Sequence, residues 1–98
     1  MRKIVLFCAA GMSTSLLVTK MREAAAAQGY EAEIDAFAVA DAANHKDADV
    51  VLIGPQVRFQ LPKLKAQFGC PVEAIDMQAY GTMDGEKVIA QAKKALGD

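Results

Sequence analysis

One stretch decides the fold of this chain: Ile4-Val5-Leu6-Phe7-Cys8-Ala9-Ala10-Gly11-Met12-Ser13-Thr14-Ser15. It opens with a continuous apolar run, which is typical of a central parallel strand that is buried on both faces. A loop of small residues follows, and strong helix formers then continue to Gln28. This succession of strand, loop and helix predicts the first unit of an α/β domain.

Cys8 stands where this strand ends and the loop begins. A glycine-containing loop that leads into a helix N-terminus binds anions, because its backbone N–H groups point inward and the helix dipole adds positive charge. A thiol at the mouth of such a site has a lowered pKa and acts as a thiolate nucleophile. We therefore predict that Cys8 carries phosphate. The backbone amides that would surround the phosphate belong to Ala9, Ala10, Gly11, Met12, Ser13, Thr14 and Ser15, and the side-chain hydroxyls of the last three are available as further donors.

Strand-like and helix-like segments alternate along the rest of the chain. Strands are expected at 3–7, 31–37, 50–53 and 71–76, and helices at 13–28, 39–45, 57–68 and 88–96. The short connections between them predict a βαβαβαβα order, which folds into a four-stranded parallel sheet with helices on both faces. Right-handed crossovers favour the strand order 2-1-3-4.

The carboxyl ends of parallel strands meet at one rim of a sheet, and ligands bind there beside the switch in strand order. Cys8 directly follows the first expected strand. Gly54-Pro55-Gln56 follows the third strand, and a loop from Met77 to Gly81 follows the fourth. The sequence therefore predicts that three loops surround the Cys8 thiol.

Length and composition set bounds on the class of protein. The 98 residues are expected to form a single domain, residues 1–98. A net charge of −1 offers no basic stripe for nucleic acid and no attraction to an anionic membrane surface. No apolar stretch approaches the roughly 20 residues that span a bilayer. The apolar run near the N-terminus is too short for a signal peptide, so we expect a cytoplasmic protein without direct membrane insertion.

The remaining chemistry-bearing residues predict structural roles. Two cysteines and one histidine, far apart in the sequence, make neither a disulfide framework nor a zinc motif, so no metal or cofactor is expected. Cys70 is expected to be structural and His45 to be a solvated surface residue. Asp76 lies at a strand end, where we expect a structural hydrogen bond rather than acid–base work.

A small cysteine-dependent phosphatase is the main alternative function. Phosphatase loops of this kind place an arginine six residues after the cysteine, and that position here is Thr14. No arginine or lysine occurs between Cys8 and Lys20, so the guanidinium clamp on a phosphoryl transition state is missing. Slow hydrolysis suits a phosphate carrier. A thiol redox protein or a non-catalytic interaction module is the third class, and a redox role requires a resolving cysteine nearer than Cys70.

The chain also resembles a known family. Its residues 6–18 are similar to the phosphorylation loop of enzyme IIB from the lactose/cellobiose/chitobiose branch of the bacterial phosphoenolpyruvate:sugar phosphotransferase system. Further matches, in the same order, are Ala48-Asp49-Val50-Val51-Leu52-Ile53-Gly54-Pro55-Gln56, Leu61-Pro62, Ile75-Asp76 and Tyr80-Gly81. The resemblance covers essentially the whole chain.

This resemblance implies a phosphocarrier. Cys8 would accept phosphate from a histidine on a IIA protein and pass it to a disaccharide held by a membrane-embedded IIC transporter. Residues 9–15 would form the phosphate cradle, and Gln56 and Tyr80 would lie on the rim or contact a partner. We expect a monomer without cofactor. The sugar remains open among cellobiose, diacetylchitobiose, lactose and related β-glucosides.

Overall fold

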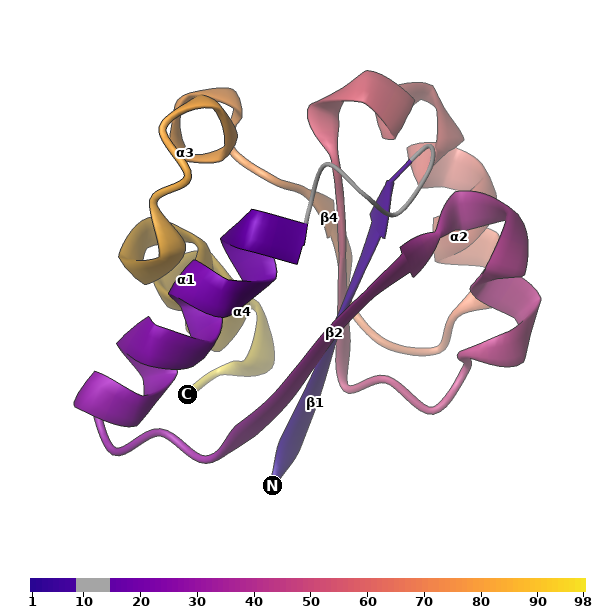
Figure 1. Ribbon diagram of the computed structural model, residues 1–98. Coiled ribbons are helices and arrows are strands. Elements are labelled where there is room, and N and C mark those ends of the chain that lie inside the picture. Colours follow the sequence, from indigo (N-terminus) through magenta and orange to yellow (C-terminus); the bar gives the residue numbers. More distant parts are fainter. Residues whose placement is uncertain (9–14) are drawn as a thin grey trace.

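The computed structural model describes residues 1–8 and 15–98 and contains a four-stranded parallel sheet (Figure 1). The strands lie in the order β2-β1-β3-β4, which confirms the predicted order. Their bounds are β1 Arg2–Cys8, β2 Ala32–Ala38, β3 Val50–Ile53 and β4 Val72–Ala74. The two central strands, β1 and β3, are the continuous apolar runs of the sequence, and the sheet buries both of their faces.

Helices cover both faces of the sheet, as predicted, and each covered face has its own apolar core. One face carries α1 Ser15–Ala27, α3 Met77–Gly81 and α4 Gly85–Leu96. The other carries α2 Leu61–Gln67 and the 3-10 helices η1 Val39–Asn44 and η2 Pro55–Gln60. Alternate residues of β1 point to opposite faces, so Ile4 and Leu6 lie in the first core and Val5 and Phe7 in the second.

Local sequence signals set the ends of the longer helices. Gly29 has φ 65° just beyond α1, and Gly97 has φ 78° at the end of α4; glycine adopts this left-handed conformation without a steric penalty. The Asp84 side chain caps the start of α4 by accepting a hydrogen bond from the Lys87 N–H at 3.1 Å. The predicted stop of the first helix at Gly29 is therefore confirmed.

Two predicted elements differ from the structure, and a third is divided as its proline indicates. The segment 39–44 forms a 3-10 helix, and the helical pattern over 57–68, in which Pro62 predicts a separate or kinked first turn, is divided into η2 and α2. Pro62 lies in the first turn of α2, because a proline there loses no helical hydrogen bond. Residues 77–81, expected as a loop, form the helix α3. In the part of the chain that the structure describes, no helix has the length and apolar character needed to cross a bilayer.

Candidate functional site

Cys8 is the last residue of β1, at the carboxyl rim of the sheet, and it pairs in register with Ala38 of β2. The residue is 1% exposed and forms no disulfide. The segment Ala9, Ala10, Gly11, Met12, Ser13 and Thr14, predicted as the phosphate cradle, lies outside the described residues. Ser15, the last member of that cradle, is the exposed first residue of α1. A cysteine therefore ends a central strand at the rim of the sheet, and the next described element along the chain is the helix α1.

The loop after β3 lies directly beside Cys8. The Gly54 N–H donates a hydrogen bond to the Phe7 carbonyl at 2.9 Å, which continues the pairing of β3 with β1 up to the rim. A Cβ atom on Gly54 would lie 3.6 Å from the Cβ of Cys8 and only 3.1 Å from Oε1 of Gln56. The Gln56 carboxamide and the Cys8 side chain therefore approach the same point from two strand ends, with glycine leaving the space between them.

The segment after β4 contributes α3 to the same rim (Figure 1). Asp76 caps this helix, since its Oδ2 accepts a hydrogen bond from the Ala79 N–H at 3.0 Å. The predicted structural role of Asp76 is confirmed. Tyr80 lies in α3 but is 8% exposed and packs in the core with α1 and α4. An aspartate three residues before the bonded amide was the available sign of this helix.

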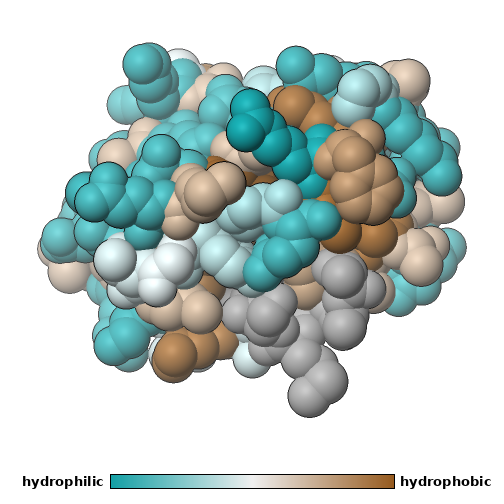
Figure 2. All heavy atoms as spheres, turned by 90° about the horizontal axis from the view of Figure 1, so that it is seen from above, coloured by the Kyte–Doolittle hydropathy of each residue, from teal (hydrophilic) through white to brown (hydrophobic). Residues whose placement is uncertain are grey.

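Large apolar side chains are exposed on the elements that follow three of the strands. They are Leu16 in the first turn of α1, Phe59 in η2 and Met77 at the start of α3, with exposed fractions of 54%, 76% and 67%. Figure 2 looks onto this rim and shows apolar surface between polar side chains on the side of η2 and α2. Each of these side chains lies on an element that directly follows a strand.

Cys70 and His45 were both predicted to have no part in the site. Cys70 is half-buried against the core of the η1 and α2 face, and this burial raises the pKa of its thiol. That position agrees with a structural cysteine. His45 was expected to be a solvated surface residue; it is half-buried, since its ring is stacked on Phe37, with centroids 3.6 Å apart and planes 12° apart. The aromatic side chain of the edge strand β2 offers a surface that the local sequence around His45 did not reveal.

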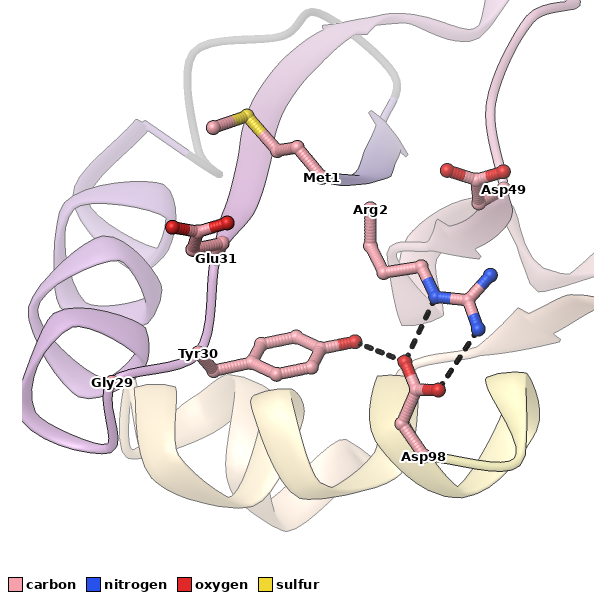
Figure 3. A pocket seen from close by; sticks show the side chains of 7 residues that line it. All are labelled: Met1, Arg2, Gly29, Tyr30, Glu31, Asp49 and Asp98. Atoms are coloured by element: carbon pink, nitrogen blue, oxygen red, sulfur yellow. Dashed lines mark hydrogen bonds and ion pairs between the residues drawn. The ribbon is translucent and has the colours of Figure 1, made fainter.

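The opposite pole of the sheet holds a polar pocket (Figure 3). Both guanidinium contacts of Arg2, from Nε and from one terminal nitrogen, reach the Asp98 carboxylate at 2.9 Å. The Tyr30 hydroxyl donates to the same carboxylate at 2.6 Å. The Arg2 guanidinium lowers the pKa of Asp98, and burial followed by the bond to Asp98 raises the pKa of Tyr30 to about 12. These contacts join the first strand to the end of α4.

A metal centre has no counterpart among residues 1–8 and 15–98, where no group of three His, Cys, Asp or Glu side chains has a metal-binding arrangement. The chemistry that the described rim supports is therefore that of a thiol at a strand end, beside a carboxamide and the first turn of a helix. The first turn of α1 contains no acidic residue that would oppose an anion.

Comparisons with known proteins agree on one family. Residues 3–91 match the family model described as "PTS system, Lactose/Cellobiose specific IIB subunit". The chain is 52% identical over 96 residues to the oligo-beta-mannoside-specific EIIB component of Bacillus subtilis, with 94% of this chain and 93% of that protein covered. It is 47% identical over 102 residues to the cellobiose-specific EIIB component of Lactococcus lactis, with 95% of this chain and 94% of that protein covered.

Solved structures give the same result at the level of the fold. The cellobiose-specific phosphotransferase IIB component of Borrelia burgdorferi is similar with a TM-score of 0.77 and 39% identity, over 98% of this chain and 92% of that chain. The lactose-specific IIB component domain of Streptococcus pneumoniae has a TM-score of 0.84 at 18% identity, with 96% of both chains covered, and supports the fold alone.

Proposed function

Because this chain belongs to the lactose/cellobiose-specific IIB subunits of the phosphotransferase system, we propose that Cys8 is the residue that carries the phosphoryl group. The observation that supports this assignment is the position of Cys8 at the end of the central strand β1, whereas the chain's other cysteine, Cys70, packs against a core. The phosphatase and redox alternatives gain no support from the described residues around Cys8.

The proposed reaction has two transfer steps. In the first, the thiolate sulfur of Cys8 attacks the phosphorus of a phosphohistidine on a IIA protein; the S–P bond forms, the N–P bond breaks, and the histidine nitrogen keeps the electron pair. In the second, a sugar hydroxyl oxygen attacks the phosphocysteine, the S–P bond breaks and the thiolate is restored. The hydroxyl proton passes to a base on the sugar-binding partner.

The surroundings of Cys8 suit a carrier of an anion. The N-terminus of α1 supplies partial positive charge, and its first turn lacks an acidic side chain. We assign the backbone amides of residues 9–15 to the phosphoryl oxygens, as in other anion loops. We assign Gln56 to the edge of this site, because its carboxamide and the Cys8 side chain both lie within 4 Å of a Cβ built on Gly54, and its Nε2 is the atom that would donate to a phosphoryl oxygen.

The partners follow from the two steps. We propose a IIA phosphohistidine protein as the donor and a membrane IIC transporter as the holder of the sugar, with this chain acting as a cytoplasmic monomer of one domain, residues 1–98. The relatives are named for different sugars, oligo-β-mannosides, galactose and cellobiose. A β-linked disaccharide or oligosaccharide is our proposed substrate class.

Phosphorus NMR tests this function directly. The chain is incubated with phosphoenolpyruvate, the general phosphotransferase proteins and a IIA protein of the disaccharide type. We expect a thiophosphate resonance that requires IIA, persists in Cys70→Ser and vanishes in Cys8→Ser. A resonance that survives Cys8→Ser would refute the assignment of Cys8. Turnover of phosphate esters without accumulation of phosphocysteine would instead favour the phosphatase.

A further inference from the structure

Strand β4 forms one edge of the sheet, and part of its backbone faces away from β3. The Ile75 N–H donates to the Ile53 carbonyl at 2.8 Å, so Ile75 faces β3. Backbone groups alternate in direction along a strand, and the carbonyl of Ala74 and the N–H of Asp76 therefore point to the open edge. A fifth parallel strand would donate an N–H to the first of these groups and accept from the second.

Gln91 makes this pair of hydrogen bonds from the middle of α4. Its Nε2 donates to the Ala74 carbonyl at 2.8 Å, and its Oε1 accepts from the Asp76 N–H at 3.2 Å. The same Nε2 also donates to Oε1 of Glu73 at 3.1 Å. The side-chain amide thus makes the two hydrogen bonds that the N–H and the C=O of one residue of a fifth strand would make.

We infer that Gln91 is a positioning residue for the Cys8 rim, an inference that rests on the proposed phosphoryl transfer. Its bond partner Asp76 is the cap of α3, and the two bonds of Asp76 leave in different directions. The backbone N–H is held by Gln91, and the carboxylate holds the Ala79 N–H at 3.0 Å. The carboxamide of α4 therefore fixes the start of α3 relative to the end of β4.

The consequence for the reaction lies in what α3 presents at the rim. Its first residue, Met77, exposes two thirds of its surface, and the helix lies at the same rim as Cys8. A donor protein that brings a phosphohistidine to Cys8 covers this region. A loosened β4–α3 junction changes the surface that the donor meets, whereas the Cys8 thiolate itself is unaltered. Gln91 thus acts on encounter with the donor and not on the chemical step.

Two substitutions separate the bonds. Gln91→Leu has a similar volume and removes both bonds to the strand edge. Gln91→Glu keeps an acceptor for the Asp76 N–H, loses the donor to Ala74 and places a second carboxylate beside Glu73. Gln67→Leu is the matched control, because it makes the same chemical change in α2, on the other face of the sheet.

Amide hydrogen exchange tests the hydrogen bonds of Gln91 to β4 without any need for activity. We expect the Asp76 N–H to exchange roughly fivefold faster in Gln91→Leu, the factor that corresponds to one hydrogen bond of about 1 kcal/mol. Gln91→Glu should protect this amide better than Gln91→Leu does, and Gln67→Leu should leave it unchanged. Equal exchange in all four proteins would overturn the inference.

Steady-state phosphorylation by a IIA phosphohistidine protein tests the effect on the reaction. In Gln91→Leu we expect KM for the donor to rise severalfold with kcat unchanged, while Gln67→Leu matches the parent chain. Faster exchange at Asp76 with an unchanged KM would reduce Gln91 to a structural residue and overturn its positioning role. If the parent chain accepts no phosphate, the proposed function fails. The exchange experiment still decides whether Gln91 holds the junction between β4 and α3.

Discussion

Gly85, the first residue of α4, lies directly against the backbone of Lys20 in α1. A Cβ atom on Gly85 would lie 2.4 Å from the Lys20 carbonyl carbon and 2.5 Å from its oxygen. Backbone atoms in the middle of a helix cannot move aside as a flexible side chain can. The two helices that cover one face of the sheet therefore meet at a point where only a hydrogen atom fits.

Gly85→Ala should destabilise the protein for this reason. Alanine favours the helical backbone by up to about 1 kcal/mol, but overpacking of this kind costs about 1–3 kcal/mol, and the contact here is with backbone. We expect the free energy of unfolding, measured with urea, to fall by about 2 kcal/mol. Gly81→Ala is the control, because nothing lies within 4 Å of a Cβ there. Equal stability of the two variants would contradict the contact.

Gln56→Glu should slow the uptake of phosphate by Cys8. The carboxamide oxygen of Gln56 approaches the Cys8 side chain across Gly54, so a carboxylate at this position opposes both the thiolate and the phosphocysteine. We expect the Cys8 thiolate to be harder to form in this variant. The rate of iodoacetamide alkylation against pH, in a Cys70→Ser background, should therefore fall at a given pH.

The control for this substitution is Gln60→Glu, which adds the same charge at the end of η2. High salt should weaken the effect at position 56, because the interaction is electrostatic. If both variants show the alkylation profile of the parent chain, the side chain of Gln56 does not act on Cys8.

Arg22→Ala should open the other edge of the sheet. The Arg2 N–H donates to the Glu31 carbonyl, so the odd-numbered residues of β2 face β1 and the Ile34 carbonyl points outward. Arg22 in α1 closes this position, with Nε and a terminal nitrogen 3.0 and 2.6 Å from that carbonyl oxygen. We expect a loss of about 1 kcal/mol in urea unfolding, discounted for the exposure of Arg22.

The same variant should self-associate through the uncovered strand. Sedimentation velocity at increasing concentration should show dimers in Arg22→Ala and a monomer in Lys20→Ala, which removes a neighbouring exposed charge from the same helix. A monomer in both variants, with unchanged stability, would show that Arg22 does not protect the edge.

Tyr30 should ionise far above the ordinary pH range. Burial, and then the hydrogen bond to Asp98, raise its pKa to about 12 in the folded chain, against about 10 for an unfolded one. Since the folded pKa is the higher, this contribution to stability is complete below pH 10 and is lost as the pH rises toward 12. NMR of the labelled Tyr30 ring measures the midpoint.

Asp98→Asn removes the carboxylate that accepts the hydrogen bond from the Tyr30 hydroxyl. The pKa of Tyr30 should then fall toward 10, and the loss of stability should move to lower pH. A titration midpoint that does not change in this variant would assign the whole shift to burial.

The sequence was most informative where burial alone decides the structure. The run 50–53 was expected as a strand and is β3, and the run 3–7 lies within β1, because a fully apolar segment between polar neighbours has few other places in an α/β domain. The position of Cys8 at the rim followed from the end of β1. Its role, and that of the cradle residues, remain proposals.

Other features depended on contacts between distant residues. The helix α3 is short and contains a glycine, so its apolar pattern was too brief to distinguish it from a loop. The stacking of His45 on Phe37 and the bonds of Gln91 to β4 join residues from different elements. No local pattern in the sequence records such pairs, and the structure was needed to find them.

The bond between Arg2 and Asp98 has a practical consequence for handling the molecule. Both ends of the described chain meet at the pole where β1 begins, while Cys8 closes the same strand at the other pole, about 20 Å away for seven extended residues. A tether attached at the Arg2 and Asp98 pole, to a bead, a fluorophore or a second protein, leaves the rim that holds Cys8 on the side away from the tether. Immobilised molecules should therefore present one uniform face to whatever flows past them.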